Sequence, residues 1–232
     1  MTPGRDRVSS EVEDDYHCMG VTIHHNADVA TRIEAVMQRA PWTTCPGAVA
    51  MLEKTFTGVS LAAFPKRGEK QTNCTHLHDL AILAAAHASD QQPLVYDILV
   101  SDPVEGRRYA QVRREGATVL AWVHSRGHIV EPPELAGVPL DQLRPWIDSL
   151  DPLMQEAARM LRWGTILSGG RTNGWEKQSD SSRLPVGNCY TFQPERMTAA
   201  RHTGATRDFS RGTTQPLDEH RPAPSQQLNK RY

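Results

Sequence analysis

A thiol, two imidazoles and a carboxylate occur within six residues of this chain, at Cys74, His76, His78 and Asp79. Cys74 and His78 are four residues apart, so on a helix they would share one face. His76 and Asp79 are three apart and would share another. A neutral imidazole beside a carboxylate suits general acid–base catalysis. We therefore predict a catalytic site here, with His76 as the acid or base, Asp79 orienting it and Cys74 beside it.

The residues that follow form the most apolar helix-forming run of the chain. Residues 77–88 are rich in Ala and Leu, which favour helix and are apolar on all sides. Such a helix is usually buried, so its first turn should lie inside the protein or at the floor of a cleft. The positive end of its dipole would stabilise a Cys74 thiolate and keep His76 and His78 neutral. We expect a reactive thiol beside neutral imidazoles.

Five further residues are predicted to bind a substrate. Cys45 precedes Pro46, which suits a first helical turn, so a second cysteine stands at a helix start. The guanidinium groups of Arg107 and Arg113 could hold a substrate carboxylate through paired hydrogen bonds. The full predicted set is Cys45, His78, Tyr96, Arg107 and Arg113.

The pattern after residue 90 changes from a helical period to strict alternation. Apolar residues alternate over 94–101, and similar short runs follow at 107–114, 118–124 and 129–130. Glycine-containing turns separate these runs, as in antiparallel hairpins. The sequence thus predicts an α+β fold with an antiparallel β-meander packed against helices.

The elements before the motif are less distinct. Residues 17–25 alternate enough to predict a strand, and apolar spacing over 28–39 predicts a short amphipathic helix. A second helix is predicted from 46 to about 56, after a Pro-rich break. Together with the meander, these elements predict one core domain over 16–167, preceded by a flexible polar arm over 1–15.

The last part of the chain differs in composition. Residues 168–232 carry ten Lys or Arg and six Asp or Glu, a net charge of +4, whereas the whole chain has a net charge of −1. A segment this polar cannot build its own core. We predict a long extended basic C-terminal arm that lies on an acidic body, and therefore a homo-oligomer in which the arm covers a second subunit.

Composition limits the other classes of partner. A net charge of −1 provides no global basic field for nucleic acid. No apolar run reaches the roughly 20 residues of a membrane span, and the polar start lacks a signal-peptide core. Four widely spaced cysteines without a CxxC pair indicate reduced thiols in the cytoplasm. No dinucleotide or phosphate-loop motif is present, so we predict no cofactor.

The stretch Cys74-Thr75-His76-Leu77, with an acidic residue at Asp79, resembles the signature of an uncharacterised bacterial family, a domain of unknown function. In that family a Pro and a Cys precede the signature, which here correspond to Pro41 and Cys45. The family's sheet segments precede its signature, whereas here they follow it, in apparently rearranged order. The resemblance implies no particular reaction and agrees in singling out Cys74 and His76.

The residues leave several functions open. The first is a cofactor-independent enzyme, a lyase or isomerase, acting on a small organic molecule that could be aromatic or carboxylated. A hydrolase with a Cys74 nucleophile is a variant of it. The second is a Zn or Fe metalloenzyme, although the spacing is unlike any compact metal motif; its ligands would come from His24, His25, Cys45, Cys74, His76 and His78. The third is a non-catalytic ligand-binding or assembly protein with buried, inert cysteines.

Overall fold

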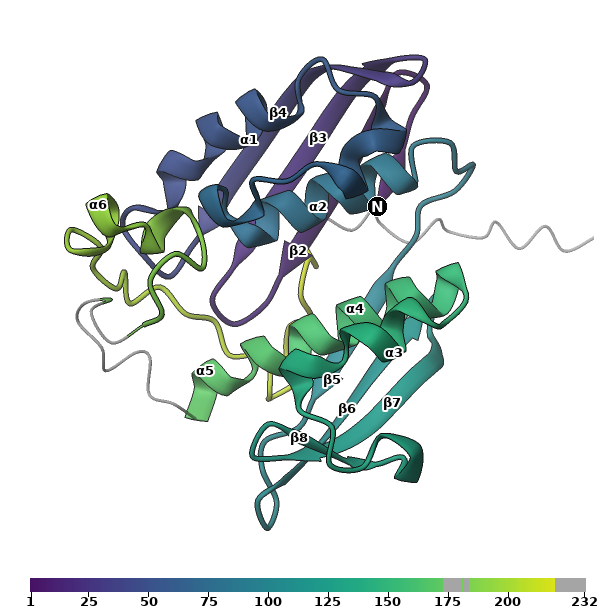
Figure 1. Ribbon diagram of the computed structural model, residues 1–232, viewed down its shortest axis with the longest axis vertical. Coiled ribbons are helices and arrows are strands. Elements are labelled where there is room, and N and C mark those ends of the chain that lie inside the picture. Colours follow the sequence, from purple (N-terminus) through teal and green to yellow (C-terminus); the bar gives the residue numbers. More distant parts are fainter. Residues whose placement is uncertain (173–180, 182–183, 220–232) are drawn as a thin grey trace, which may run out of the picture. The chain divides into compact units, whose positions relative to one another are not determined.

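The fold was analysed in a computed structural model that describes residues 1–172, 181 and 184–219. The chain divides into two compact units, one formed by Met1–Pro93 with Gln178–Tyr232 and the other by Leu94–Lys177. Each unit contains a four-stranded antiparallel sheet and helices, so the predicted α+β class is confirmed (Figure 1). The single core domain predicted over 16–167 is wrong, because the chain builds two separate cores.

The first unit begins with a meander in the order β1-β2-β3-β4. The strands are β1 (Thr2–Pro3), β2 (Arg7–Glu13), β3 (Cys18–Asn26) and β4 (Val29–Arg39). The flexible arm predicted over 1–15 is therefore wrong, because β2 pairs with β3 along its whole length. The helix predicted over 28–39 is also wrong. These residues form β4, in which Ile33 pairs with Ile23 and both side chains are buried.

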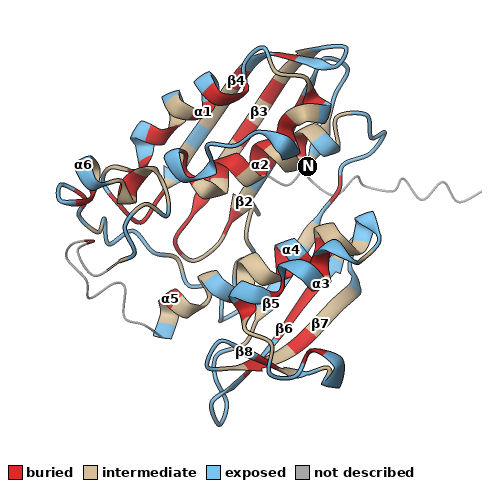
Figure 2. Cartoon of the chain, in the orientation of Figure 1, coloured by how far each residue is buried: buried red, intermediate tan, exposed pale blue. Residues whose placement is uncertain are grey.

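Two helices cover one face of this sheet. α1 (Ala48–Phe56) packs against β4, and α2 (Thr75–Ala86) packs against β2 and β3 (Figure 1). Short 3₁₀ helices connect them, at Cys45–Gly47, Leu61–Lys66 and Lys70–Thr72. The large apolar side chains of this core, each with at most 2% exposure, include Ile23, Leu52, Phe56, Phe64, Leu77 and Leu80 (Figure 2). Burying each contributes roughly 1.5–3 kcal/mol of hydrophobic stabilisation.

The second unit repeats this order of elements. Its meander β5-β6-β7-β8 confirms the predicted strands, with bounds Tyr96–Val100, Arg107–Arg114, Ala117–Ser125 and His128–Glu131. Each hairpin turns on a residue followed by glycine, both with positive φ, as in Glu115 (49°) and Gly116 (80°). Two-residue turns of this kind match the twist of antiparallel strands, and glycine adopts the second position without strain.

Helices follow the strands in this unit too. They are α3 (Arg144–Asp148), α4 (Pro152–Leu167) and α5 (Gly169–Thr172), with 3₁₀ helices at Pro133–Leu135 and Leu140–Gln142. Asp151 caps α4 by accepting hydrogen bonds from the amides of Leu153 and Met154. α4 packs on β5, β6 and β7, where the buried Trp122 donates its indole N–H to Thr165 Oγ1 at 3.2 Å.

Of the arm predicted over 168–232, residues 168–172 belong to the second unit, and the described segment 184–219 packs within the first unit. It contains a 3₁₀ helix (Tyr190–Phe192) and α6 (Pro194–Met197) and is otherwise irregular. The amide of Tyr190 donates to the carbonyl of Asn73 at 2.8 Å, and Thr203 Oγ1 donates to the carbonyl of Ala40 at 2.9 Å. The arm thus finds a surface on its own chain, and the homo-oligomer stays a prediction.

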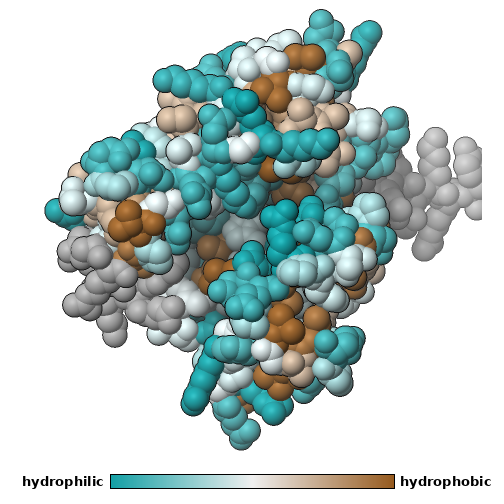
Figure 3. All heavy atoms as spheres, viewed as in Figure 1, coloured by the Kyte–Doolittle hydropathy of each residue, from teal (hydrophilic) through white to brown (hydrophobic). Residues whose placement is uncertain are grey.

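The outer surface shows where polar and apolar side chains lie. Hydrophilic side chains dominate the face seen in Figure 3, where hydrophobic ones form small separate patches. Among the helices of the described residues, none combines the length and the apolar composition that crossing a membrane requires.

The substitution Gly47→Ala tests how tightly the C-terminal arm packs on the first unit. Gly47 has φ −63°, which alanine adopts readily, but an added Cβ would lie 2.6 Å from the hydroxyl of Tyr190. We predict that Gly47→Ala lowers the free energy of unfolding by about 1 kcal/mol, measured by chemical denaturation, because the Tyr190 ring must shift. In a Tyr190→Ala background the same change should be neutral or stabilising. Gly68→Ala, where an added Cβ meets nothing within 4 Å, is the matched control. An equal loss with and without the Tyr190 ring would contradict this packing.

Candidate functional site

The candidate site is built around the first turn of α2, where Cys74 is the N-cap residue. The preceding segment is fixed by Asn73, which is fully buried. Its side-chain amide donates to Thr55 Oγ1 at 2.9 Å and to the carbonyl of Glu69 at 3.0 Å. The thiol of Cys74 makes no capping hydrogen bond of its own. The helix start is therefore held by its neighbours.

His76 lies between a thiol and a second imidazole. Its Nδ1 is 3.9 Å from Cys74 Sγ, a contact at the long end of the range for sulfur. Its ring lies tilted against that of His17, with centroids 4.1 Å apart and an interplanar angle of 31°. The structure thus brings Cys74 and His76 together. His17, which directly precedes β3, is the third member of this cluster.

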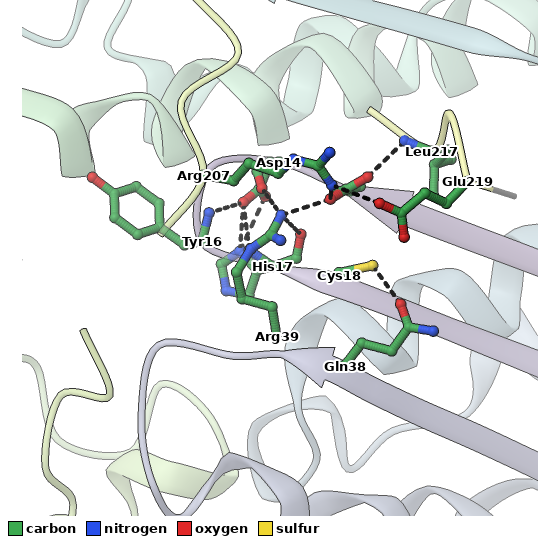
Figure 4. A network of polar contacts seen from close by, with 10 residues as sticks. Asp14, Tyr16, His17, Cys18, Gln38, Arg39, Arg207, Leu217 and Glu219 are labelled. Carbon is green, nitrogen blue, oxygen red and sulfur yellow. Dashed lines mark hydrogen bonds and ion pairs between the residues drawn. The ribbon is translucent and has the colours of Figure 1, made fainter. Parts of the chain in front are cut away.

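His17 belongs to the hairpin loop that joins β2 to β3, and Asp14 begins that loop. His17 Nδ1 lies 3.0 Å from each carboxylate oxygen of Asp14 (Figure 4). The same carboxylate accepts the backbone amides of Tyr16 at 2.7 Å and His17 at 2.8 Å. Because a carboxylate accepts hydrogen bonds, Nδ1 of His17 carries a proton, and the tautomer of the ring is set.

Arg39 holds this loop in place. Its Nη2 donates to the carbonyl of Asp14 at 2.7 Å, to that of His17 at 3.2 Å and to Glu13 Oε1 at 2.9 Å (Figure 4). A guanidinium that joins three oxygens of one hairpin fixes the loop backbone, and with it the direction of the His17 side chain.

The C-terminal arm reaches the same network. The Glu13 side chain, only 4% exposed, also accepts a hydrogen bond from Arg207 Nη1 at 3.2 Å and the amide of Leu217 at 2.7 Å (Figure 4). Burial alone would raise the pKa of Glu13, but these hydrogen bonds and the two arginine charges lower it. The arm is therefore a structural part of the unit that carries the site.

The electrostatics keep Asp14 charged and His76 neutral. Burial opposes the charge of Asp14, but the attraction and hydrogen bond of His17 outweigh it and lower the pKa of Asp14 from 3.8 to about 2. His76 retains some accessible surface, yet burial is the largest cause holding its pKa well below 6.5. His17 lowers this pKa further, whereas Asp14 raises it. At neutral pH the imidazole of His76 is therefore an uncharged proton acceptor.

Three cysteines gather near this turn, but as protonated thiols. Burial raises the pKa of Cys74 to about 12, and it also raises the pKa of Cys45 and Cys189. The thiols lie near enough that Cys45 and Cys189 each contribute to the upward shift at Cys74. Thr191 Oγ1 donates to Cys45 Sγ at 3.4 Å. The expected reactive thiolate is wrong, because desolvation outweighs the helix dipole.

Asp79 and His78 lie elsewhere on α2. Both carboxylate oxygens of Asp79 accept hydrogen bonds from Lys70 Nζ, at 2.6 and 2.7 Å. The predicted orientation of His76 by Asp79 is thus replaced by a pairing of Asp79 with Lys70. His78 is buried against Phe56, with ring centroids 5.0 Å apart, and its Nε2 lies 3.2 Å from the carbonyl of Gly68. It is a core residue packed beside Phe56.

The other predicted binding residues belong to the second unit. Tyr96 donates its hydroxyl to Glu156 at 2.8 Å. Arg107 is exposed and lies 3.7 Å from Glu131, and Arg113 is exposed on β6. Tyr96, Arg107 and Arg113 thus belong to the second unit, whereas the cluster around His76 belongs to the first.

Sequence reasoning missed Asp14 and His17 as members of this cluster. It placed Asp14 in a flexible arm and His17 at the start of a strand. The usable signal was the alternation of Val8, Ser10 and Val12, which mirrors that of the next strand and indicates a hairpin. An Asp three residues before a His in a hairpin loop is spaced to hydrogen-bond it.

Two hollows open on the surface of the first unit. One hollow lies beside the end of α2, and another lies on the sheet face around Cys18 and Gly20; neither is lined by Cys74 or His76. Among the described residues, no three His, Cys, Asp or Glu side chains are placed to share a metal ion. The proposed ligands for a Zn or Fe site are therefore not brought together in that part of the chain.

Comparison of the chain with protein-family models, with curated proteins and with solved structures gives no match. The resemblance carried by Cys74-Thr75-His76-Leu77 stays a prediction.

Low pH should destabilise the hairpin loop because it protonates the carboxylate of Asp14. Its pKa is lower in the folded than in the unfolded chain, so its stabilisation is present above pH 4 and is lost as the pH falls toward 2. We predict that Asp14→Asn lowers the free energy of unfolding at pH 7 by about 2 kcal/mol and flattens its dependence between pH 5 and 2. Urea denaturation at several pH values measures both effects. Asp6→Asn, at an exposed position, is the control, and a curve for Asp14→Asn parallel to that of the wild type would refute the stabilising contact between Asp14 and His17.

The native thiols should react slowly. Because Cys45 and Cys74 are buried and protonated, we predict that iodoacetamide at pH 7.5 alkylates them at least about 100-fold more slowly than it alkylates glutathione. Mass spectrometry of peptides from the native chain and from the chain in urea measures the difference. Rapid modification of Cys74 in the native chain would revive a nucleophilic role for this residue.

Proposed function

We propose that the chain is a cofactor-independent enzyme that uses histidine acid–base catalysis on a small organic molecule, in a reaction of the lyase or isomerase type. The observation that carries the proposal is the close, tilted contact between the rings of His76 and His17, with Asp14 hydrogen-bonded to His17. In this arrangement His76 is the acid or base, and Asp14 acts on it through His17, in place of the direct orientation that the sequence assigned to Asp79.

The two rings share the field of a single carboxylate. The negative charge of Asp14 favours a positive charge on the pair of rings. A proton on one ring disfavours a second proton on the other ring. The cluster therefore favours one added proton over two, as interacting titrating groups do. A neutral His76 can take a proton from a carbon or oxygen of the substrate, and Asp14 stabilises the imidazolium that results. Returning that proton to another substrate atom completes an elimination or an isomerisation.

Cys74 has a positioning role in this scheme. With its pKa raised to about 12, the thiol stays protonated near Nδ1 of His76 and can act as a weak hydrogen-bonding partner. It supplies no nucleophile, so we do not extend the proposal to a covalent acyl intermediate.

A cytoplasmic location is part of the proposal. All four cysteines, Cys18, Cys45, Cys74 and Cys189, are free thiols. Free thiols in a chain of this size support a reducing compartment. The substrate remains a small molecule, and the proposal needs neither nucleic acid nor a second subunit.

A second candidate is a non-catalytic ligand-binding protein. Two observations favour it: the hollows lie away from His76, and the nearby thiols are protonated. Under this candidate the Asp14–His17–His76 cluster would fasten the hairpin to α2 and would perform no chemistry.

Proton exchange distinguishes the two candidates without knowledge of the substrate. An enzyme that removes a carbon-bound proton should transfer solvent deuterium into its substrate, so we would screen small carboxylated and aromatic molecules in D₂O by NMR. We predict that wild-type protein labels at least one compound and that His76→Asn slows labelling by at least about 100-fold, the usual size of an acid–base contribution.

The matched control is His87→Asn. His87 Nδ1 lies 2.7 Å from Asp90 Oδ2, a similar His–Asp pair at the opposite end of α2, and this variant should retain full exchange. Circular dichroism would verify that both variants fold. Labelling that is unaffected by His76→Asn, or equally reduced by His87→Asn, would contradict the assignment of His76.

A further inference from the structure

One backbone hydrogen bond brings two cysteines of distant segments together. The amide of Tyr190 in the C-terminal arm donates to the carbonyl of Asn73, with N and O 2.8 Å apart. Cys189 directly precedes Tyr190, and Cys74 directly follows Asn73. Because both peptide groups are planar, this bond holds the Cα atoms of the two cysteines about 7 Å apart or less. A disulfide usually joins Cα atoms about 4.4–6.8 Å apart, so a small local adjustment suffices to bond this pair.

The cysteines differ in how far solvent reaches them. Cys189 keeps intermediate exposure, whereas Cys18, Cys45 and Cys74 are buried. A dissolved oxidant therefore meets Cys189 first. Cys74 needs no access to solvent for a reaction with Cys189, because both thiols belong to the same chain and their backbones are joined by the hydrogen bond described above.

The surroundings of Cys189 offset part of the cost of ionising its thiol. Burial, the largest influence, raises the pKa of Cys189. The backbone amides of Phe192 and Thr191 lower it, and so does the charge of Arg196. This guanidinium is fixed in place, since its Nε donates to the carbonyl of Tyr190 at 2.7 Å. The raised pKa leaves a small thiolate fraction at neutral pH, so oxidation of Cys189 is slow.

A third thiol, that of Cys45, is the alternative partner for Cys189. Thr191 Oγ1 donates to Cys45 Sγ at 3.4 Å, so this sulfur is already engaged in a hydrogen bond. The thiol of Cys74 makes no capping hydrogen bond, and its contact with Nδ1 of His76 is long, at 3.9 Å. The structure therefore favours Cys74 over Cys45 as the partner.

We propose that Cys189 and Cys74 form a reversible disulfide in the presence of hydrogen peroxide, which fastens the C-terminal arm to the start of α2. The Cys189 thiolate attacks one peroxide oxygen, the O–O bond breaks, and the sulfur becomes a sulfenic acid while hydroxide leaves and takes up a proton. The sulfur of Cys74 then attacks that of Cys189, an S–S bond forms, and the hydroxyl group leaves as water with the Cys74 proton. The two thiols lose two electrons, and one peroxide becomes two water molecules.

The disulfide changes the surroundings of His76 without taking part in its chemistry. It removes the free thiol that lies 3.9 Å from His76 Nδ1 and closes a long loop between the arm and α2. A thiol reductant restores both cysteines by disulfide exchange. The proposal does not depend on the proposed catalytic function.

Peroxide oxidation of the full native chain tests the proposal. The four cysteines fall in different tryptic peptides, so each possible disulfide gives a peptide of its own mass. After oxidation, the remaining thiols are blocked with N-ethylmaleimide in urea, and the digest is analysed by mass spectrometry. We expect the Cys74–Cys189 pair in about tenfold excess over any other pair, because the backbone geometry selects the partner. The same oxidation carried out in urea should give mixed pairs.

Single substitutions localise the bond. Cys189→Ser should remove it, whereas Cys45→Ser, the same change at a buried neighbouring thiol, should retain the Cys74–Cys189 pair. Oxidation should also raise the urea midpoint of unfolding of the wild-type chain, with no shift in Cys189→Ser, and dithiothreitol should reverse the rise. The proposal is overturned if no disulfide forms, if Cys45 is the partner of either thiol, or if the Cys74–Cys189 pair dominates equally in urea.

Discussion

The carboxylate of Asp14 is the constraint on which the described site depends. It accepts hydrogen bonds from two backbone amides and the imidazole of His17, so its charge is satisfied within the arrangement of the four-residue hairpin loop. That arrangement places the His17 ring against His76 at the start of α2. A residue 62 positions away from His76 in the sequence thereby sets its electrostatic surroundings.

The buried Glu13 extends this constraint to the end of the chain. A buried carboxylate is costly unless it is paired and hydrogen-bonded, and here the partners are Arg39 from β4 and Arg207 with Leu217 from the C-terminal arm. The arm therefore contributes charge to the fold of the first unit. Its basic composition has a use within its own chain, which explains how a segment too polar to form a core can still pack.

Much of the fold could be predicted from local signals, but the site could not. Alternation and X-Gly turns located β5 to β8, and the alanine-rich run located α2, because each signal lies within a few residues. The prediction for β4 was wrong because the spacing of Val29, Ile33 and Val36 fits a helix as well as a strand. Only the pairing with β3 decides between helix and strand. Cys74 and His76 could be singled out by residue type, whereas their partner Asp14 depends on a contact between distant segments. The high thiol pKa depends on burial, which the helix dipole argument ignored.

Imidazole NMR tests the central claim most directly. If Asp14, His17 and His76 form one cluster, the rings of His17 and His76 should show nuclear Overhauser contacts. Long-range ¹H–¹⁵N spectra should show Nδ1 of His17 protonated. His76 should remain neutral well below pH 6.5, as its lowered pKa requires. A His76 that titrates near pH 6.5 and shows no contact with His17 would contradict the account.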